Sequence, residues 1–549
     1  MAENFREKIT SKTFLVFLGI FVIGLFLRLY ALDKYPISFH SQEALLGWRA
    51  KSLLVTGKDE TGRPLPLIFS SLEGYQLPLA TYMVLPSVKA FGLNEFGVRF
   101  PFAFLGSLSL LAFYGIVLSL FKDKKMSLWA AFIFATSPGI IFLSRIASPP
   151  NLSLSFFLLG FFCLLWGAKK RFFLIGAFIF LLGSLYAAKM VWVFLLPFLL
   201  LYWIFTRKKE IGFLIIILAF ACLPLLFSYS ASPQAKLDLV HSDFNLFSEV
   251  TILNGINMMR GEDIAAGYPF LGRIFYTKLF YLEKIFENFL RHFNPRFYFA
   301  AGDGHPLHGL TNFGPIFLVF LPLSLLGIKW ITSKERKKLF FLLFWFILGI
   351  IPSVFVIPSP NQEKVLFVLP VLIILAAYAL SRLNLRPVLL FLLFLLFNFA
   401  VVFYDGLIKE PFRNLGKWQY SYKELSLFLG DQLKNYEKIF LTDAYGSDPG
   451  PAYLFYTDFP PQKFLEKDAL VFSYRNYISK IGNITINQQN QWMPQKSALY
   501  IIAPSEEKIM ERFGLQKTEV LPVKVIRDPD GKTAFMAFTI FPHEVKNEK

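Results

Sequence analysis

The sequence predicts a polytopic α-helical membrane protein that ends in an α/β domain outside the membrane. The first observation is composition: 55% of the 549 residues are hydrophobic and only 17% are charged, whereas soluble proteins average about 25% charged residues. The second is a near-continuous series of apolar segments between residues 13 and 405. The third is a change of pattern after residue 411, where runs of β-branched and aromatic residues alternate with amphipathic stretches.

Crossing a bilayer core takes about 20 apolar residues in a helix, and by this measure the chain has about eleven transmembrane segments. Their expected bounds are 13–32, 98–121, 127–145, 152–168, 172–187, 190–206, 211–229, 312–328, 339–357, 365–381 and 387–404. The first segment lacks a small-residue cleavage site, so we interpret it as an uncleaved helix rather than a signal peptide. Both cysteines, Cys163 and Cys222, fall inside these segments, which argues against a disulfide framework or a zinc site.

Basic residues beside the apolar segments predict how the chain is oriented. They gather in alternate connections: Arg6, Lys8, Lys12; Lys122, Lys124, Lys125; Lys169, Lys170, Arg171; Arg207, Lys208, Lys209; Lys329, Lys334, Arg336, Lys337, Lys338; Arg382, Arg386. Cytoplasmic connections carry an excess of Lys and Arg, so we expect a multi-pass protein of the cytoplasmic (inner) membrane with a cytoplasmic N-terminus. An odd number of spans then places the C-terminal domain outside. The net charge of +18 comes mostly from these connections and does not indicate a nucleic-acid partner.

We expect two domains. Residues 1–405 form a transmembrane domain with large outer loops at 33–97 and 230–311, and residues 411–549 form an accessory α/β domain. All six histidines lie on the outer side: His40, His241, His292, His305, His308 and His543. Histidine is often functional, so chemistry is expected on that face.

Strands and helices of the tail are predicted from their residue patterns. The expected strands are 438–444, 498–504, 520–526 and 534–541, and the expected helices are 422–436 and 505–514. This tail has no nucleophile elbow, P-loop or paired metal motif, so its expected role is accessory.

Polar residues cluster in the first outer loop, directly after the first span. Glu43 is flanked by His40, Gln42 and Arg49, and a carboxylate beside a membrane can act as a general base. The alternative is a helix cap or an ion pair with Arg49. Further on, Asp59 and Glu60 stand between glycines, where ordinary turn formation competes with a catalytic role.

Two further groups of polar residues lie at the outer face. In the second outer loop, Asp303, His305 and His308 come close together among glycines. Such a triplet could bind a divalent cation, or it could contact a ligand or phosphate; no third histidine supports the metal. Three cations stand at outer ends of spans: Arg99, Arg145 and Lys364. They could extend to lipid headgroups or form a basic cluster for a lipid-linked phosphate.

Long ungapped motifs resemble the GT-C membrane glycosyltransferases of family 39, which include protein O-mannosyltransferases and the lipid A aminoarabinose transferase. These motifs are TGKDETGRPLPL (56–67), FGLNEFGVRFP (91–101), SP…SR (137–145) with Asn151, and GDGHPLHG (302–309). The resemblance spans most of the membrane region and implies a GT-C-like fold. It also implies inverting transfer of a sugar from a polyprenyl-phosphate donor to a lipid, glycan or protein acceptor at the outer face.

The resemblance also implies residue roles. Glu43 is the expected base. The residues expected to bind the donor phosphate or substrate are Gln42, Asp59, Glu60, Tyr75, Gln76, Arg99, Arg145, Asn151, Asp303, His305, His308 and Lys364. No cofactor is assigned, a divalent cation stays an alternative, and no metal-ligating residue is assigned.

Three positions depart from the family pattern. Gln42 stands where the family usually has aspartate, Gln76 lies where bacterial relatives carry a phosphate-binding lysine, and Pro149 replaces a common glutamate. The alternative function is therefore a catalytically impaired relative that binds lipid phosphate or acts as a membrane scaffold.

Overall fold

The structure is a computed structural model of the whole chain, and it describes residues 12–71, 74–167, 170–446, 448–466, 470–472, 478–486, 492–495, 498–506, 508–514 and 520–540. His543, Phe541 and the basic residues Arg6, Lys8 and Lys169, which entered the sequence predictions, lie outside these ranges. The chain divides into two compact units. The first comprises residues 1–32, 77–80 and 99–407, and the second comprises residues 33–76, 81–98 and 408–549.

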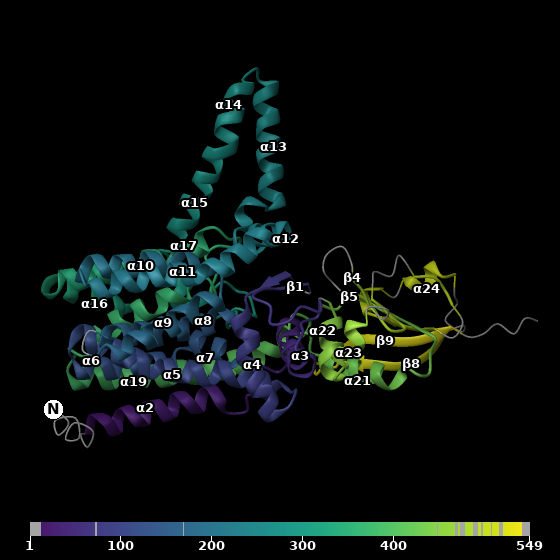
Figure 1. The fold of residues 1–549 in the computed structure, drawn as a ribbon, viewed down its shortest axis with the longest axis horizontal. Coiled ribbons are helices and arrows are strands. Elements are labelled where there is room, and N and C mark those ends of the chain that lie inside the picture. The colour runs from purple at the N-terminus through teal and green to yellow at the C-terminus, as the bar shows by residue number, and fades with distance from the viewer. Residues whose placement is uncertain are drawn as a thin grey trace, which may run out of the picture. The chain divides into compact units, whose positions relative to one another are not determined.

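The first unit is a bundle of apolar helices (Figure 1). Its helices are α2 (Lys12–Leu29), most of α5 (Glu95–Phe121), α6 (Lys124–Thr136), α7 (Pro138–Arg145), α8 (Pro149–Gly167), α9 (Phe172–Ala187), α10 (Met190–Thr206), α11 (Lys209–Ala231), α16 (Phe320–Lys334), α17 (Arg336–Val354), η5 (Leu366–Val368), α18 (Leu369–Leu380) and α19 (Leu385–Val401), followed by η6 (Val402–Lys409). Each expected span coincides with at least one of these helices.

Several of these helices can cross a membrane. Within the described residues, six are long and apolar enough by themselves, and the bent pair α6–α7 adds a seventh. The shorter apolar helices are Phe172–Ala187, Met190–Thr206 and Leu366–Leu380. The protein is thus a multi-pass membrane protein, as the composition predicted.

Two expected spans have a different form in the structure. The segment 127–145 is not one helix, because the chain bends by 53° between α6 and α7; Pro138 at the first position of α7 lacks the N–H that would continue α6. The segment expected at 312–328 becomes helical only at Phe320. A Cβ at Gly314 would lie 2.6 Å from the backbone of residues 298–300. The chain at Gly314 therefore packs directly against the backbone of that segment, and the helix begins only after this contact.

The second outer loop is largely helical and belongs to the first unit. It contains α12 (Pro233–Asp238), η1 (Leu239–Asp243), η2 (Asn245–Phe247), α13 (Val250–Ala265), α14 (Pro269–Ile274), η3 (Phe275–Leu279), α15 (Phe280–Arg291) and η4 (Phe297–Ala301). Figure 1 shows α13, α14 and α15 projecting from the helix bundle.

The second unit combines the first outer loop with the C-terminal region. It holds α3 (Ser41–Thr56), β1 (Phe69–Ser71), β2 (Gly74–Gln76), most of α4 (Pro78–Phe91), α20 (Glu410–Arg413), α21 (Tyr422–Gln432), α22 (Gly450–Tyr456), α23 (Pro461–Leu465), η8 (Pro504–Glu506) and α24 (Ile509–Arg512). This unit extends beyond the domain expected at 411–549, because α3 packs against α22 and α23. The division into domains 1–405 and 411–549 itself stays a prediction.

A seven-stranded sheet organises the second unit, with strand order β4-β5-β6-β3-β7-β9-β8. The strands are β3 (Lys438–Leu441), β4 (Leu470–Phe472), β5 (Ile478–Ile481), β6 (Ile484–Ile486), β7 (Ala498–Ile502), β8 (Val520–Arg527) and β9 (Thr533–Ile540). β3 lies parallel to both β6 and β7, and the other pairs are antiparallel. The four strands predicted from the sequence all form.

Helix α3 is held in this unit by its apolar face. Trp48 is fully buried, its indole N–H donates to the carbonyl of Phe459 at 2.9 Å, and its ring packs against Phe464. At Gly47 a Cβ would lie 2.8 Å from the ring of Phe455. Close packing therefore fixes the helix that carries the predicted base.

Candidate functional site

Glu43 occupies the third position of α3 and forms a capping box with His40. Its carboxylate accepts from the backbone N–H of His40 at 3.4 Å, while the His40 imidazole accepts from the backbone N–H of Gln42 at 3.3 Å. Burial lowers the pKa of His40 to about 4, against an opposing effect of the Glu43 charge, so the imidazole is neutral and able to accept. Of the two alternatives for Glu43, the structure favours the cap over a pair with Arg49.

Gln42 contributes only its backbone N–H to this cap. Its side chain is exposed, whereas Glu43 is only 5% exposed. The two adjacent residues at the expected catalytic position therefore differ in access to water, and neither is an aspartate.

Arg49 pairs with Glu60 and also reaches Gln76. The guanidinium donates through Nε to the Glu60 carboxylate at 2.6 Å and through Nη1 to the Gln76 side-chain oxygen at 2.8 Å. The side chains of Arg49 and Glu60 are both fully buried. Tyr75, the neighbour of Gln76 on β2, is half-buried. The structure thus joins three residues of the first outer loop into one buried polar cluster.

Asp59 closes the turn that precedes this cluster. Its Oδ1 accepts from the backbone N–H groups of Thr61 and Arg63, both at 2.9 Å, and its Oδ2 lies 3.3 Å from the Arg63 guanidinium. These are the contacts of an aspartate that stabilises a turn. The turn alternative weighed in the sequence therefore accounts for its position.

In the first unit, Arg145 and Arg99 bind backbone carbonyls at and just beyond the C-terminal end of α2. Arg145 donates to the carbonyl oxygens of Leu27 at 2.9 Å and Ala31 at 3.1 Å. Arg99 donates to the carbonyl of Leu32, three residues after the helix, at 3.3 Å. Helix C-termini leave carbonyls without intrahelical partners, so Arg145 caps α2, and Arg99 binds the segment that follows it.

Asn151 lies in the first turn of α8. Its amide donates to the Ser144 hydroxyl at 3.4 Å, and a Cβ at Gly106 would lie 2.6 Å from that same hydroxyl. The contact joins α8 to α7, and Asn151 is buried.

Asp303 and His308 form a hydrogen-bonded pair in the second outer loop. The Asp303 Oδ2 contacts His308 Nδ1 at 2.7 Å and accepts from the backbone N–H of Gln362 at 2.9 Å. The His305 ring stacks on His308 with centroids 4.1 Å apart. The structure thus brings Asp303, His305 and His308 together.

The contact between Asp303 and His308 shifts the pKa values of both side chains. Burial acts to lower the pKa of His308, but the hydrogen bond to Asp303 and the Glu363 carboxylate, 3.9 Å from Nε2, outweigh it and raise that pKa. The pKa of Asp303 is lowered, because the contact with His308 outweighs burial. A raised pKa increases the protonated fraction of His308 at a given pH, and a protonated imidazole donates hydrogen bonds through both ring nitrogens.

Lys364 lies in a different network. Its ammonium forms an ion pair with Asp243, and Asp243 also pairs with Lys189 at 3.0 Å. Lys189 in turn contacts Asp238 at 2.9 Å. Since Asp243 neutralises Lys364 directly, the expected basic cluster of Arg99, Arg145 and Lys364 is divided between two sets of partners.

Sequence reasoning missed Gln362. Three glycines surround its side chain: a Cβ would lie 2.1 Å from it at Gly309, 2.6 Å at Gly302 and 3.1 Å at Gly139. Its buried amide nitrogen has no hydrogen-bond partner among the described residues. The glycines of GDGHPLHG were visible in the sequence, but nothing there connected them to a residue more than fifty positions later.

The cation alternative for the histidine triplet finds no support. Among the described residues, no group of three or more His, Cys, Asp or Glu side chains could hold a metal ion.

Comparisons with known proteins show what the chain is similar to. Residues 51–223 match the model of the dolichyl-phosphate-mannose-protein mannosyltransferase family. A search of curated proteins finds no match.

Solved structures match nearly the whole chain. The first is ArnT from Cupriavidus metallidurans in the apo state, with 12% identity, a TM-score of 0.52, and 95% of this chain and 97% of that one covered. ArnT bound to undecaprenyl phosphate gives 13% identity and a TM-score of 0.53, with 96% and 98% covered. The archaeal oligosaccharyltransferase AglB from Archaeoglobus fulgidus, in complex with an inhibitory peptide and a dolichol-phosphate, gives 12% and 0.50, with 95% and 74% covered.

Identities this low establish the fold alone, and the family match covers less than half of the chain. Within those bounds the fold class and the resemblance predicted from the sequence are confirmed. The chain is a multi-pass membrane protein with the GT-C glycosyltransferase fold, and its residues 51–223 carry the protein mannosyltransferase pattern.

Proposed function

We propose that this protein transfers a sugar from a polyprenyl-phosphate-linked donor to a lipid, glycan or protein acceptor at the outer face of the cytoplasmic membrane, with inversion. The observation that carries the proposal is the mannosyltransferase match over residues 51–223 inside a GT-C fold that covers nearly all of the chain. Two proteins with this fold are seen with undecaprenyl phosphate and dolichol-phosphate, which supports a polyprenyl phosphate as the donor's carrier.

The proposed reaction needs a base and an anion-binding group. The acceptor oxygen attacks the anomeric carbon, the bond from that carbon to the phosphate oxygen breaks, and the acceptor proton passes to Glu43. The polyprenyl phosphate leaves with the extra negative charge, which cations stabilise. We assign this stabilisation to Arg99 and Arg145, whose guanidinium groups bind carbonyls at and just beyond the end of α2.

Other predicted residues receive supporting roles in the proposal. The His308 imidazolium, held by Asp303, is suited to contact a phosphate or the acceptor. Lys364 would have to exchange Asp243 for a phosphate, so we assign it a lesser contribution. Asp59 and Glu60 shape the first outer loop, in which we assign Tyr75 and Gln76 as substrate contacts. Asn151 of α8 is assigned a substrate contact separately.

Substitution at Glu43 separates catalysis from capping. Glutamine serves in a capping box as glutamate does, so Glu43→Gln keeps the start of α3 but cannot accept a proton. We expect Glu43→Gln to lose transfer by about 10²-fold or more, the usual contribution of a general base, with unchanged thermal stability. Glu43→Ala should lose both activity and about 1 kcal/mol of stability.

The assay measures sugar transfer by purified protein in detergent from a panel of polyprenyl-phosphate sugars. Gln42→Asp restores the residue that the resemblance expects and serves as the matched control; it should keep or raise the rate. Full transfer by Glu43→Gln would remove Glu43 as the base while leaving the reaction itself in place.

A second candidate is a catalytically impaired relative that binds lipid phosphate or acts as a scaffold. It is favoured by the exposed Gln42 at the expected aspartate position and by the capping role of Glu43. This candidate predicts binding of undecaprenyl phosphate without turnover of any donor, and a gain of transfer only in Gln42→Asp.

A further inference from the structure

A polar cavity lies at the ends of four membrane helices, on the side opposite to the proposed chemistry by the predicted topology. Its volume is about 370 Å³, and it is lined by Leu164, Gly167, Arg171, Leu174, Tyr202, Lys208, Glu210 and Ile211. These residues come from the end of α8, the start of α9, the end of α10 and the start of α11. A headgroup-sized ligand fits such a volume.

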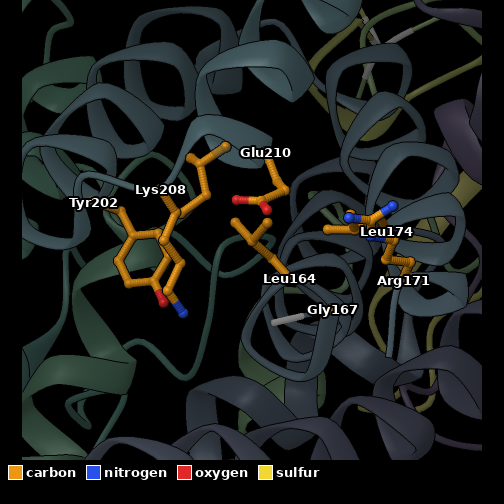
Figure 2. A pocket seen from close by; sticks show the side chains of 8 residues that line it. Leu164, Gly167, Arg171, Leu174, Tyr202, Lys208 and Glu210 are labelled. Carbon is orange, nitrogen blue, oxygen red and sulfur yellow. The ribbon is translucent and has the colours of Figure 1, made fainter. Parts of the chain in front are cut away.

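The charged groups around this cavity are not paired with one another. Figure 2 shows Arg171 on one side, Lys208 and Tyr202 on the other, and the Glu210 carboxylate between them. In the part of the chain that the structure describes, none of Arg171, Lys208 and Glu210 forms an ion pair. Two cations and one anion therefore face the same space.

Tyr202 adds a hydroxyl to the lining of the cavity. The residue as a whole is only 8% exposed, and its ring packs against Phe161 and Phe341. This packing holds the hydroxyl at the cavity, where it can donate to a ligand oxygen.

The starts of helices α9 and α11 also lie at the cavity and favour an anionic ligand group. Arg171 and Lys208 are the N-cap residues of these helices, and neither start has a side-chain cap. The partial positive charge of a helix N-terminus favours an anion, whereas here cations occupy the cap positions. The carboxylate of Glu210 already lies in the first turn of α11, so a phosphate in the cavity would offset the start of α9 and the two side-chain charges.

Glu210 narrows the choice of ligand. A purely anionic headgroup would be repelled by its carboxylate, whereas a headgroup that joins a phosphate to a primary amine would satisfy all of the charges at once. Leu164, Leu174 and Ile211 provide apolar surface for the glycerol and the first methylenes of a lipid. We propose that this cavity binds an aminophospholipid of the phosphatidylethanolamine type, with phosphate at Arg171, Lys208 and Tyr202 and the amine at Glu210.

The test is a lipid titration of the full-length protein in detergent, followed by native mass spectrometry. Phosphatidylethanolamine, phosphatidylcholine and phosphatidylglycerol with identical acyl chains are compared, and soluble phosphoethanolamine distinguishes headgroup binding from lipid binding. Because the trimethylated amine cannot donate a hydrogen bond to Glu210, phosphatidylcholine should bind about tenfold more weakly than phosphatidylethanolamine.

Single substitutions in the cavity test the proposed amine contact and the proposed phosphate contacts separately. Glu210→Gln should reduce the preference for phosphatidylethanolamine over phosphatidylcholine to less than about twofold, since only the charge-assisted bond is lost. Arg171→Gln and Lys208→Gln should weaken both lipids alike. Lys329→Gln, which removes an exposed cation of α16 that does not line the cavity, should change neither.

Three results would overturn the proposal: equal binding of phosphatidylethanolamine and phosphatidylcholine by the native protein, an unchanged preference in Glu210→Gln, or tighter binding of phosphatidylglycerol. Each variant is checked for an unchanged thermal unfolding midpoint, so a loss of binding is not a loss of fold. None of these measurements depends on sugar transfer.

Discussion

Arg49 and Glu60 form a buried ion pair whose two side chains are both inaccessible to water. Removing one partner leaves an uncompensated charge in a low-dielectric environment, which costs about 3–5 kcal/mol. We therefore expect Glu60→Gln and Arg49→Gln each to lower the thermal unfolding midpoint strongly, as measured by tryptophan fluorescence in detergent. The double variant Arg49→Met with Glu60→Leu should be less destabilised than either single variant, because no charge remains buried. Mild effects of both single variants would show that water reaches the pair.

The pair His308–Asp303 should make stability depend on pH in a specific direction. The pKa of His308 is raised above its ordinary value of 6.5, so its stabilising contribution is complete below 6.5 and is lost as pH rises through the native pKa. The difference in unfolding midpoint between native protein and His308→Gln should therefore shrink as pH rises above 6.5 and through the native pKa of His308. Asp303, with its lowered pKa, stays ionised over this range. A difference that grows with pH would contradict the assignment, and Glu363→Gln should weaken the dependence without removing it.

Residue type is enough to choose candidate side chains for chemistry from the sequence, but not to predict all of their contacts. His308 and Asp303 are five positions apart in a glycine-rich loop, so their contact followed from proximity. Lys364 and Asp243 are separated by more than a hundred residues, and no pattern in either segment predicts that they pair. For this reason the sequence placed Lys364 with the arginines, while the fold gives it a carboxylate.

At the scale of helices, α16 and α18 pack through a glycine. A Cβ at Gly327 would lie 2.0 Å from the carbonyl oxygen of Leu375, and backbone cannot move aside as a flexible side chain can. Small residues allow such close approach between membrane helices. We expect Gly327→Ala to destabilise the protein by about 1–3 kcal/mol, seen as a lower unfolding midpoint and a lower yield of monodisperse protein.

Gly19 provides the matched control for that substitution. It lies inside α2, where a Cβ would meet nothing within 4 Å. Gly19→Ala should therefore be neutral or slightly stabilising, because alanine favours the helix by up to about 1 kcal/mol. An equal loss in both variants would indicate a general effect of the added methyl group rather than the contact with Leu375.

Helix positions were predictable because apolar length and flanking charges are local properties. The break at Pro138 and the late start of α16 depend on what the chain meets in space, such as the backbone beside Gly314. Strands β4, β5 and β6 have only three or four residues each, too few for an alternating pattern to stand out. The equally short β3 was predicted because it lies in a longer run of suitable residues at 438–444. The longer strands β8 and β9 were recognised.

At the scale of the molecule, the fold is shared with ArnT at 12–13% identity over more than nine-tenths of the chain. Such a fold depends on where apolar helices begin and end, and many sequences satisfy that requirement. Catalysis depends on a few side chains, and here Gln42, Gln76 and Pro149 differ from the expected pattern. The architecture was therefore predictable from hydropathy, whereas activity has to be measured.

The orientation of the whole chain can be tested by labelling single cysteines. Cys163 and Cys222 are both buried and are first replaced by serine. The positive-inside rule places the connection containing Lys334 in the cytoplasm and α13 and the C-terminal unit outside. In spheroplasts of a bacterial host, a membrane-impermeant maleimide should label Met258→Cys and Lys434→Cys, whose side chains are exposed. Lys334→Cys, equally exposed, should react only after permeabilisation. Labelling of Lys334→Cys in intact spheroplasts would reverse the topology, and with it the face assigned to glycosyl transfer.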